Sequence, residues 1–429
     1  MKKLQITNYE LRGKHFMLFC FLVLQPLSLL TANAQPFRTR SFTDRIKTLQ
    51  VHKAGEWNVS PIIKLNQDNE QIEINFDLMG AAPEYYTYKI IHCNADWQSS
   101  QLIESEFMDG LQNLPLEDYA HSFNTKMEYV NYKLLIPNDN IQLKVSGNYV
   151  VQIFTEDEQL ILNACFSALE PQSSIAMQVS PITDKGSNHK FQSVRLEVAY
   201  GIEIKSPFNE LKVYVQQNNR WDNAAQAIQP LTLQNRTAIY DHNPALIFDA
   251  GNEYRRFEMT TTYYAGMNIA SVEYYEPYYH SILFPDRIRS DRAYFFYEDL
   301  NGRFYVRNND ASDSDLEADY QVVLFYVPCD KPLTDKLYLL SDAFNNSFDF
   351  RSEMEYNVKD KGYTKAVLLK EGYYNYLFVS RKNASSPAST EAIEGDYYQT
   401  ENEYRAFVYA RPVGVRYDRL IGVQTVQYK

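Results

Sequence analysis

The stretch Gln71 to Phe76, QIEINF, decides the fold class. Its apolar residues Ile72, Ile74 and Phe76 alternate with polar residues. Successive side chains of a β-strand point to opposite faces, so this alternation puts one face against a core and the other in water. The stretch therefore predicts a half-buried strand.

The same period of two recurs at 194–198, 211–215 and 374–378. Turn signals separate these runs, and Asn301-Gly302 between two aromatic runs is typical of a hairpin. No long stretch keeps a helical period, and the best helix candidate is short, at 102–111. Short strands at this spacing predict an all-β protein made of immunoglobulin-like β-sandwiches.

Two polar segments, 169–174 and 308–317, predict domain boundaries. They divide the chain into an N-terminal β-sandwich at 35–172, a middle β-sandwich at 173–309 and a C-terminal immunoglobulin-like β-sandwich at 310–429. Each segment has the usual size of such a domain. The alternating acidic residues 313–319 could offer oxygen ligands to calcium, but they lack the order of a calcium loop. We expect this segment to be a solvated acidic linker.

Residues 1–34 are predicted to be a signal peptide. A basic start precedes the apolar run 16–30, and Thr31-Ala32-Asn33-Ala34 has the small residues that signal peptidase reads. Cleavage is expected between Ala34 and Gln35. The apolar run is short for a spanning helix, and no later run reaches the ~20 apolar residues that a span needs. We therefore expect an exported chain without a membrane span.

The balance of charge argues against several partners. The formal net charge is −12, and loss of a leader with four Lys or Arg and one Glu lowers it to −15. Nucleic acids and anionic membranes attract clustered cations, and no basic stripe is evident, so we expect neither as a partner. Cys93, Cys165 and Cys329 remain after cleavage, an odd number. Buried free thiols are favoured over a bridge between Cys93 and Cys165.

The run His92 to Trp97, HCNADW, places a His, a Cys, a carboxylate and an indole within six residues. It could be a metal site, a thiol nucleophile or a sugar cradle. Strand alternation puts His92 and Cys93 on opposite faces, and no further Cys or His has zinc-ligand spacing. We expect Asp96 to cap the following turn and Trp97 to pack in a core.

No motif indicates catalysis. Six His remain after cleavage, and none forms HxH or HExxH; GxSxG and CxxC are also absent from the sequence. Triads and carboxylate pairs are assembled in space, so the sequence leaves a hydrolase open as a third interpretation. We expect a protein that is not an enzyme and that uses no cofactor or metal.

Tyrosines near the C-terminus are the strongest binding candidates. Alternation puts Tyr374 and Tyr376 on one face of a strand and Tyr373 on the other, and Tyr397 and Tyr398 follow. Exposed Tyr clusters mark protein interfaces and sugar sites. The alternative is cross-strand Tyr pairing on a solvated sheet.

Several stretches together resemble the plug protein family of the type IX secretion system. They include HCNADW at 92–97, NRWDNA at 219–224, DLNGRF at 299–304, LKEGYYNY at 369–376 and RYDRLIG at 416–422. The resemblance runs through the whole chain after residue 34, and departs at Ala250, where the family usually has Gly. It implies a structural or partner-facing role for the signature residues His92, Asn94, Asp96, Trp97, Trp221, Asp222 and Asn223.

The resemblance implies a non-enzymatic periplasmic protein. Such a protein would bind the periplasmic end of the giant outer-membrane β-barrel translocon and close its pore. Segments 338–344 and 372–376 are also similar to the immunoglobulin-like glycan-binding modules of glycogen-branching enzymes. The alternative function is therefore glycan binding by a β-sandwich protein of the periplasm or cell surface; a fold likeness does not itself carry function.

Overall fold

The computed structural model describes residues 35–429, so Ala34 and the predicted leader lie outside the described residues. Strands make up 48% of the structure and helices 5%, which confirms the all-β prediction. Three α-helices of four residues each occur in the described range, α1 (Glu104–Phe107), α2 (Pro207–Glu210) and α3 (Ser314–Glu317). Among residues 35–429, no helix is long and apolar enough to cross a membrane.

The first core lies between two antiparallel sheets and draws on residues 46–168. One sheet has the order β2-β4-β9-β8, with the bounds Ile46–Lys53, Ile72–Met79, Tyr129–Ile136 and Tyr119–His121. The other has the order β1-β12-β11-β5-β7, with the bounds Arg40–Ser41, Leu160–Leu169, Gly147–Thr155, Tyr86–Cys93 and Leu114–Pro115. Strand β3 (Ile62–Lys64) pairs in parallel with β12, and β6 (Met108–Gly110) pairs with β10 (Ile141–Leu143).

Strand β4 begins at Ile72, one residue into the QIEINF stretch, and it buries Ile72, Ile74 and Phe76 completely, as the alternation predicts. The opposite face of β4 is not solvated, however. Asn75 and Asp77 are buried there as well, because residues of α3 and of the strand that ends at Lys370 pack against them.

The middle core combines residues 177–248 with residues 404–421. One sheet has the order β13-β16-β20-β19, with the bounds Ser173–Ser180, Phe191–Tyr200, Thr237–Tyr240 and Thr232–Gln234; β21 (Ile247–Asp249) pairs with β16. The other has the order β18-β17-β31-β32, with the bounds Ala225–Ile228, Leu211–Gln217, Asn402–Ala410 and Arg419–Tyr428. A short hairpin joins β14 (Ile182–Thr183) and β15 (Gly186–Ser187).

The third core draws on residues 257–393. Its larger sheet has the order β23-β24-β26-β29-β28, with the bounds Ile269–Tyr275, Tyr278–Leu283, Tyr320–Pro328, Gly362–Lys370 and Glu355–Asn357. In the facing sheet β30 (Gly372–Arg381) pairs with β22 (Arg255–Met259), β25 (Phe304–Val306) and β27 (Lys336–Leu340). The 3-10 turns η1 (Pro244–Leu246) and η2 (Asp342–Phe344) complete the described elements.

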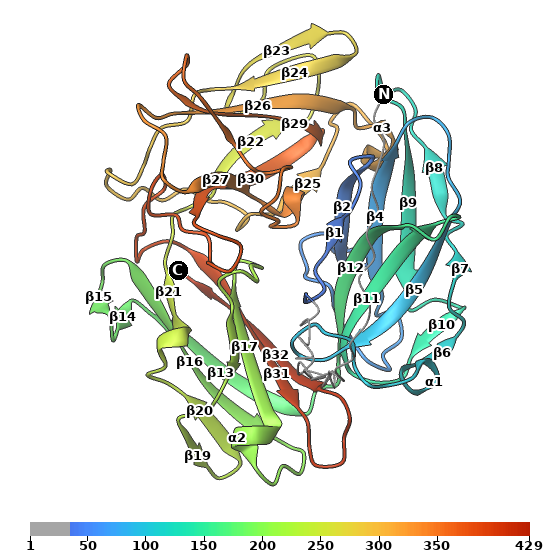
Figure 1. Cartoon of the computed structure of the whole chain (residues 1–429), viewed down its shortest axis with the longest axis vertical. Helices are drawn as coiled ribbons and strands as arrows, with labels where there is room; N and C mark the ends of the chain where they lie inside the picture. The colour runs from blue at the N-terminus through green and yellow to red at the C-terminus, as the bar shows by residue number, and fades with distance from the viewer. Residues whose placement is uncertain (1–34) are drawn as a thin grey trace, which may run out of the picture. The chain divides into compact units, whose positions relative to one another are not determined.

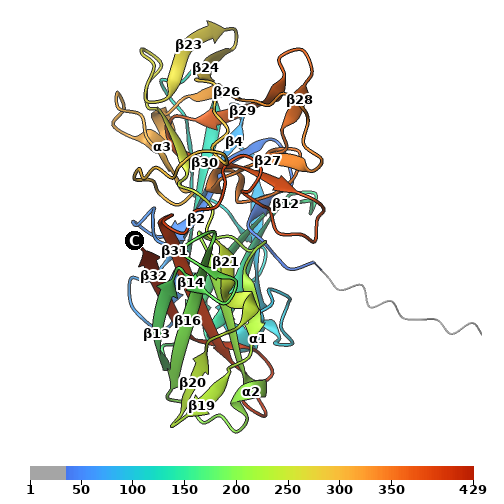
Figure 2. The same cartoon turned by 90° about the vertical axis from the view of Figure 1, so that its left-hand side faces the viewer.

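The strand pairing does not follow the predicted boundary at 309/310. Strands β22 and β24 precede that boundary, yet β22 pairs with β30 and β24 pairs with β26 beyond it. Strands β31 and β32 return to the middle core, where β31 pairs with β17 from Leu211↔Ala410 to Gln217↔Tyr404. Figure 1 shows this return, because β31 and β32, red in colour, lie beside the green β17. Figure 2 shows β31 and β32 in a view turned by 90°. Alternation identifies strands, but it contains no information about distant partners.

The acidic segment 308–317 is exposed or half-buried, as expected of a solvated segment, but it is not a free linker. It forms α3, with Asp313 as the N-cap, and it contacts the first core. Asp315 lies within ion-pair distance of Lys133 Nζ at 3.5 Å, and Phe123 N donates to the carbonyl oxygen of Leu316 at 3.1 Å. Its polar groups form hydrogen bonds and an ion pair at a junction between two cores. Low apolar content in this segment therefore does not indicate a free linker.

Candidate partner-binding site

His92 and Cys93 end β5 and point to different cores. The His92 ring meets the Tyr149 and Tyr417 rings edge-on, with centroids 5.0 and 5.3 Å apart, and its Nε2 lies 3.2 Å from the Ser146 carbonyl oxygen. Burial lowers the pKa of His92 to about 4, so the ring is neutral at pH 7. Cys93 packs with Trp97, Val150 and Cys165 in a separate cluster. The two side chains therefore do not share a site.

The rest of the HCNADW run attaches the first core to the end of the chain. Asp96 Oδ1 accepts a hydrogen bond from Gln98 N at 3.1 Å, which is the expected turn cap. Asn94 Oδ1 accepts from Arg411 at 2.7 Å, and Ala95 N donates to Asp418 Oδ2 at 3.0 Å. These contacts give the run a role in joining the first core to the strands of the middle core.

Trp97 and Trp221 meet across the same boundary. Trp97 is 4% exposed, and the two indole rings form a T-shaped contact with centroids 5.7 Å apart. Asp222 is bound through both oxygens by Arg220, at 2.8 and 3.1 Å, and it accepts from Ala388 N at 2.8 Å. Asn223 donates to Gln217 Oε1 at 2.9 Å. The NRWDNA run thus joins the middle core to the loop after β30.

Two of the candidate interface tyrosines are in a core. Tyr374 and Tyr376 are 2% and 4% exposed, and Tyr374 stacks on Phe257 with centroids 5.1 Å apart. The prediction that they face a partner is therefore wrong, because their face of β30 is the one that the larger sheet covers. Tyr373, on the other face, is half-buried against Tyr305.

Tyr397 and Tyr398 lie in the loop before β31, and both are half-buried. The Tyr397 hydroxyl donates to the carbonyl oxygens of Arg289 and Arg292, at 2.8 and 2.6 Å. Tyr398 N donates to the His189 carbonyl oxygen at 3.0 Å. These two tyrosines hold loops in place, and Tyr397 fixes the loop that carries two arginines of the pocket described next.

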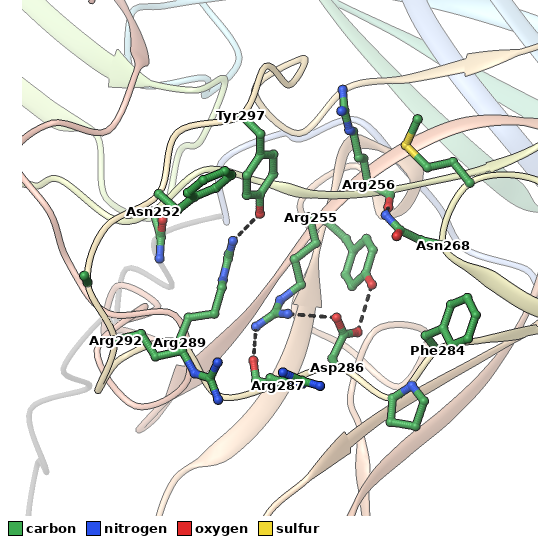
Figure 3. A pocket seen from close by; sticks show the side chains of 15 residues that line it. Asn252, Arg255, Arg256, Asn268, Phe284, Asp286, Arg287, Arg289, Arg292 and Tyr297 are labelled. Atoms are coloured by element: carbon green, nitrogen blue, oxygen red, sulfur yellow. Dashed lines mark hydrogen bonds and ion pairs between the residues drawn. The ribbon is translucent and has the colours of Figure 1, made fainter.

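A pocket of about 580 Å³ opens on the third core, between β22 and the segments that follow β22 and β24 (Figure 3). Five arginines line it, and aromatic or apolar side chains stand among them. We call this cavity the arginine pocket. Its arginines are Arg255, Arg256, Arg287, Arg289 and Arg292. The pocket falls in the size range of protein ligand sites.

At the floor of the arginine pocket, Arg255 and Arg289 are balanced in charge by nearby carboxylates. Arg255 lies 2.8 Å from Asp286 and 2.9 Å from Glu394, and Arg289 lies 2.6 Å from Glu394. Figure 3 shows the Arg255 guanidinium turned toward Asp286, and Tyr376 donates to the second oxygen of that carboxylate at 2.8 Å. Burial alone would raise the pKa of Glu394, but Arg255 and Arg289 hold it below its usual value. Hydrogen bonds and ion pairs therefore fix the floor.

The other three arginines, Arg256, Arg287 and Arg292, form the rim of the pocket, and nearby carboxylates do not balance their charge as closely. Within residues 35–429, neither Arg256 nor Arg287 forms an ion pair, and Arg256 donates to the backbone oxygen of Glu298 at 2.9 Å. The ion-pair partner of Arg292 in the same described range is the exposed Asp291, at 4.0 Å. Phe284 and Phe295 also line the pocket, and they are 59% and 75% exposed.

The arginine pocket was missed in the sequence because its members come from two segments 30 residues apart. The available signal is the run DRIRSDR at 286–292, which repeats Arg at short spacing. The sequence shows no continuous basic stripe, and a local group of arginines drawn from two segments was not predicted. No group of three or more His, Cys, Asp or Glu side chains in the described part of the chain is arranged to hold a metal ion.

Comparisons with known proteins place the chain in a family. The model of the type 9 secretion system plug protein, first domain, matches residues 46–170, which contain the first core. The crystal structure of a hypothetical protein from Parabacteroides merdae is similar with a TM-score of 0.90 and 45% sequence identity, over 92% of this chain and 100% of that chain. No curated protein matches the chain. The chain belongs to the type IX secretion system plug protein family.

Proposed function

We propose that this chain is a non-enzymatic periplasmic protein that binds the periplasmic end of the outer-membrane β-barrel translocon of type IX secretion and closes its pore. Membership in the plug family supports an accessory role in that system. The structural observation that carries the proposal is that buried polar contacts join the three cores to one another. A body that blocks a pore needs bulk and a fixed shape, and it does not need a reactive centre.

The first and third cores are joined through β4 and β29. Lys370 Nζ lies 2.7 Å from Asp77 Oδ2, and the Tyr129 hydroxyl donates to the Ala318 carbonyl oxygen at 2.9 Å. These groups are buried and hydrogen-bonded, and their contacts exist only while the two cores stay packed together. The junction therefore resists opening.

The middle core is joined to both of the others. Asp418, which is fully buried, accepts from Ala95 of the first core and pairs with Lys212 and Arg411 at 3.0 and 2.8 Å. Arg303 of the third core lies 2.9 Å from Glu403 of β31. Each of the three cores thus contacts the other two. This arrangement supports a protein that closes the pore as one rigid body, rather than one that bends at a hinge between cores.

Capture from outer membranes tests this function. The tagged full chain, added to detergent-solubilised outer membranes that contain the secretion system, should recover a very large β-barrel protein. An excess of untagged chain should compete for that recovery, which controls for binding to the matrix. Recovery of the chain without such a barrel, or recovery that the untagged chain does not reduce, would contradict the proposal.

Glycan binding is the weaker alternative. Sugar sites use exposed aromatic faces, and two of the three tyrosines in the Gly-Tyr-Tyr-Asn-Tyr run, Tyr374 and Tyr376, are buried in the third core. We expect no retardation of the chain during electrophoresis through gels that contain polysaccharide.

A further inference from the structure

We propose that the arginine pocket binds a segment of a partner protein in which carboxylate side chains stand beside aromatic or aliphatic ones. The assignment of that partner to the secretion apparatus rests on the proposed function. The pocket itself is argued from its own residues, and its ligand chemistry can be tested separately.

The charge of the rim selects for an anion. Arg256, Arg287 and Arg292 line the pocket, and within residues 35–429 their side chains have no close carboxylate partner, whereas Arg255 and Arg289 pair with Asp286 and Glu394. The chain as a whole has a net charge of −12, so this is a local reversal of sign. Screening limits the influence of distant acidic groups to about 8 Å at physiological ionic strength. An anionic group is therefore attracted to this rim.

The apolar side chains at the same opening select for a larger ligand. Phe284, Phe295 and Met267 line the pocket and are exposed, and Phe296 and Tyr264 are exposed in the same two segments. An inorganic ion gains nothing from these side chains. Arginine together with exposed aromatic residues is the composition of energetically important centres of protein interfaces.

One further observation favours a carboxylate over a phosphate. Asp286 and Glu394 already pair with Arg255 and Arg289, so fewer guanidinium groups remain to balance a multiply charged phosphate than a single carboxylate needs.

Peptide titration tests the ligand chemistry. The probe is a fluorescent hexapeptide of alternating Asp and Phe, and its counterpart has Asn in place of Asp. We expect the full chain to bind the Asp peptide at least about tenfold more tightly than the Asn peptide, because the rim guanidinium groups attract carboxylates and gain no such attraction from neutral amides. Equal binding of the two peptides would overturn the inference. So would binding of inorganic phosphate or phosphatidylglycerol vesicles without binding of the Asp peptide.

A charge-reversed variant tests the location. Arg287→Glu with Arg292→Glu should weaken binding of the Asp peptide by at least about tenfold. Both side chains are exposed, so the variant should keep its fold, which an unchanged thermal midpoint would show. The matched control is Lys331→Glu with Lys359→Glu, which changes the net charge equally at exposed positions outside the pocket and should bind as the unchanged chain does. Equal binding by both variants would overturn the location.

Membrane capture with the same variants separates this inference from the proposed function. If the unchanged chain recovers the barrel and the Arg287→Glu, Arg292→Glu variant does not, the pocket is the contact. If both recover it equally, the pocket is not the contact and the inference fails while the proposed function stands. If neither recovers a barrel, the proposed function fails, and the peptide titration alone decides whether the pocket binds acidic segments.

Discussion

Lys370 and Asp77 form a buried ion pair between two cores that are distant in sequence. The Lys370 ammonium lies 2.7 Å from Asp77 Oδ2, and the two side chains are 1% and 0% exposed. The Tyr320 hydroxyl donates to the same oxygen at 2.6 Å, and the ammonium also donates to the Asp315 carbonyl oxygen at 2.7 Å. The Tyr129 ring lies beneath the ammonium, 4.2 Å from it. The pair is thus surrounded by further polar and aromatic partners.

Removing one member of this pair should destabilise the protein strongly. Asp77→Asn leaves the Lys370 ammonium in the interior without its counter-charge, and we expect a loss of about 3 to 5 kcal/mol in the free energy of unfolding. Urea unfolding followed by tryptophan fluorescence measures it. Glu353→Gln, which breaks the surface pair of Lys336 and Glu353, is the control and should change the free energy of unfolding far less, because water screens that pair. Similar losses in the two variants would refute the assigned role of the junction.

Trp97 should act through packing between the first and middle cores. Trp97→Ala removes a buried indole and its contact with Trp221, and the expected loss is about 3 to 5 kcal/mol. Thermal unfolding in a calorimeter measures it, with Val413→Ala at an exposed position as the control. A loss of barrel recovery in membrane capture without any loss of stability would show instead that Trp97 faces the partner.

Glu253 should make the protein less stable as the pH rises. Burial raises its pKa from 4.5 to about 7, and the hydroxyl of Tyr294 donates to it. The folded chain therefore holds a proton that the unfolded chain releases between about pH 4.5 and 7, so stability from this group falls through that window. Glu253→Gln keeps the acceptor oxygen and should gain about 1 to 3 kcal/mol at pH 8 and nothing at pH 4. Urea unfolding at both pH values measures the gain, and a variant less stable than the unchanged chain at pH 8 would contradict this account.

The three cysteines after residue 34 should differ in reactivity. Cys93 and Cys165 are free and buried, whereas Cys329 is partly exposed. Burial raises the pKa of Cys165 to about 12 and also raises the pKa of Cys93. In a chain that lacks residues 1–34, we expect one thiol to react rapidly with a disulfide reagent in the folded state, and three after denaturation without reductant. Cys329→Ser should abolish the rapid reaction. Only one thiol after denaturation would reveal a bridge between Cys93 and Cys165.

The sequence predicted the positions of strands better than it predicted which distant strands and side chains contact them. Alternation correctly identified the strand with Ile72, Ile74 and Phe76, because burial of one face is a local pattern. It could not show that Asp77 on the other face is buried, since the covering residue, Lys370, is 293 positions away. The same limit explains why β31 was not assigned to β17.

The candidate site was predicted less well for a related reason. Composition showed an acidic chain, and an average over the chain hides five arginines that converge from residues 255–256 and 287–292. Tyr374 and Tyr376 were expected to be interface candidates because alternation separates two faces without saying which face is the core. The free state of Cys93 and Cys165 and the turn cap of Asp96 follow local rules, and the structure agrees with both.

Closure of the pore is the central claim, and the conductance of the isolated translocon tests it most directly. The purified barrel in a planar lipid bilayer should conduct ions, and addition of the full chain to its periplasmic side should lower that conductance in proportion to the chain bound. The chain carrying Lys331→Glu and Lys359→Glu should lower it equally. Unchanged conductance when the chain is bound to the barrel would contradict the account.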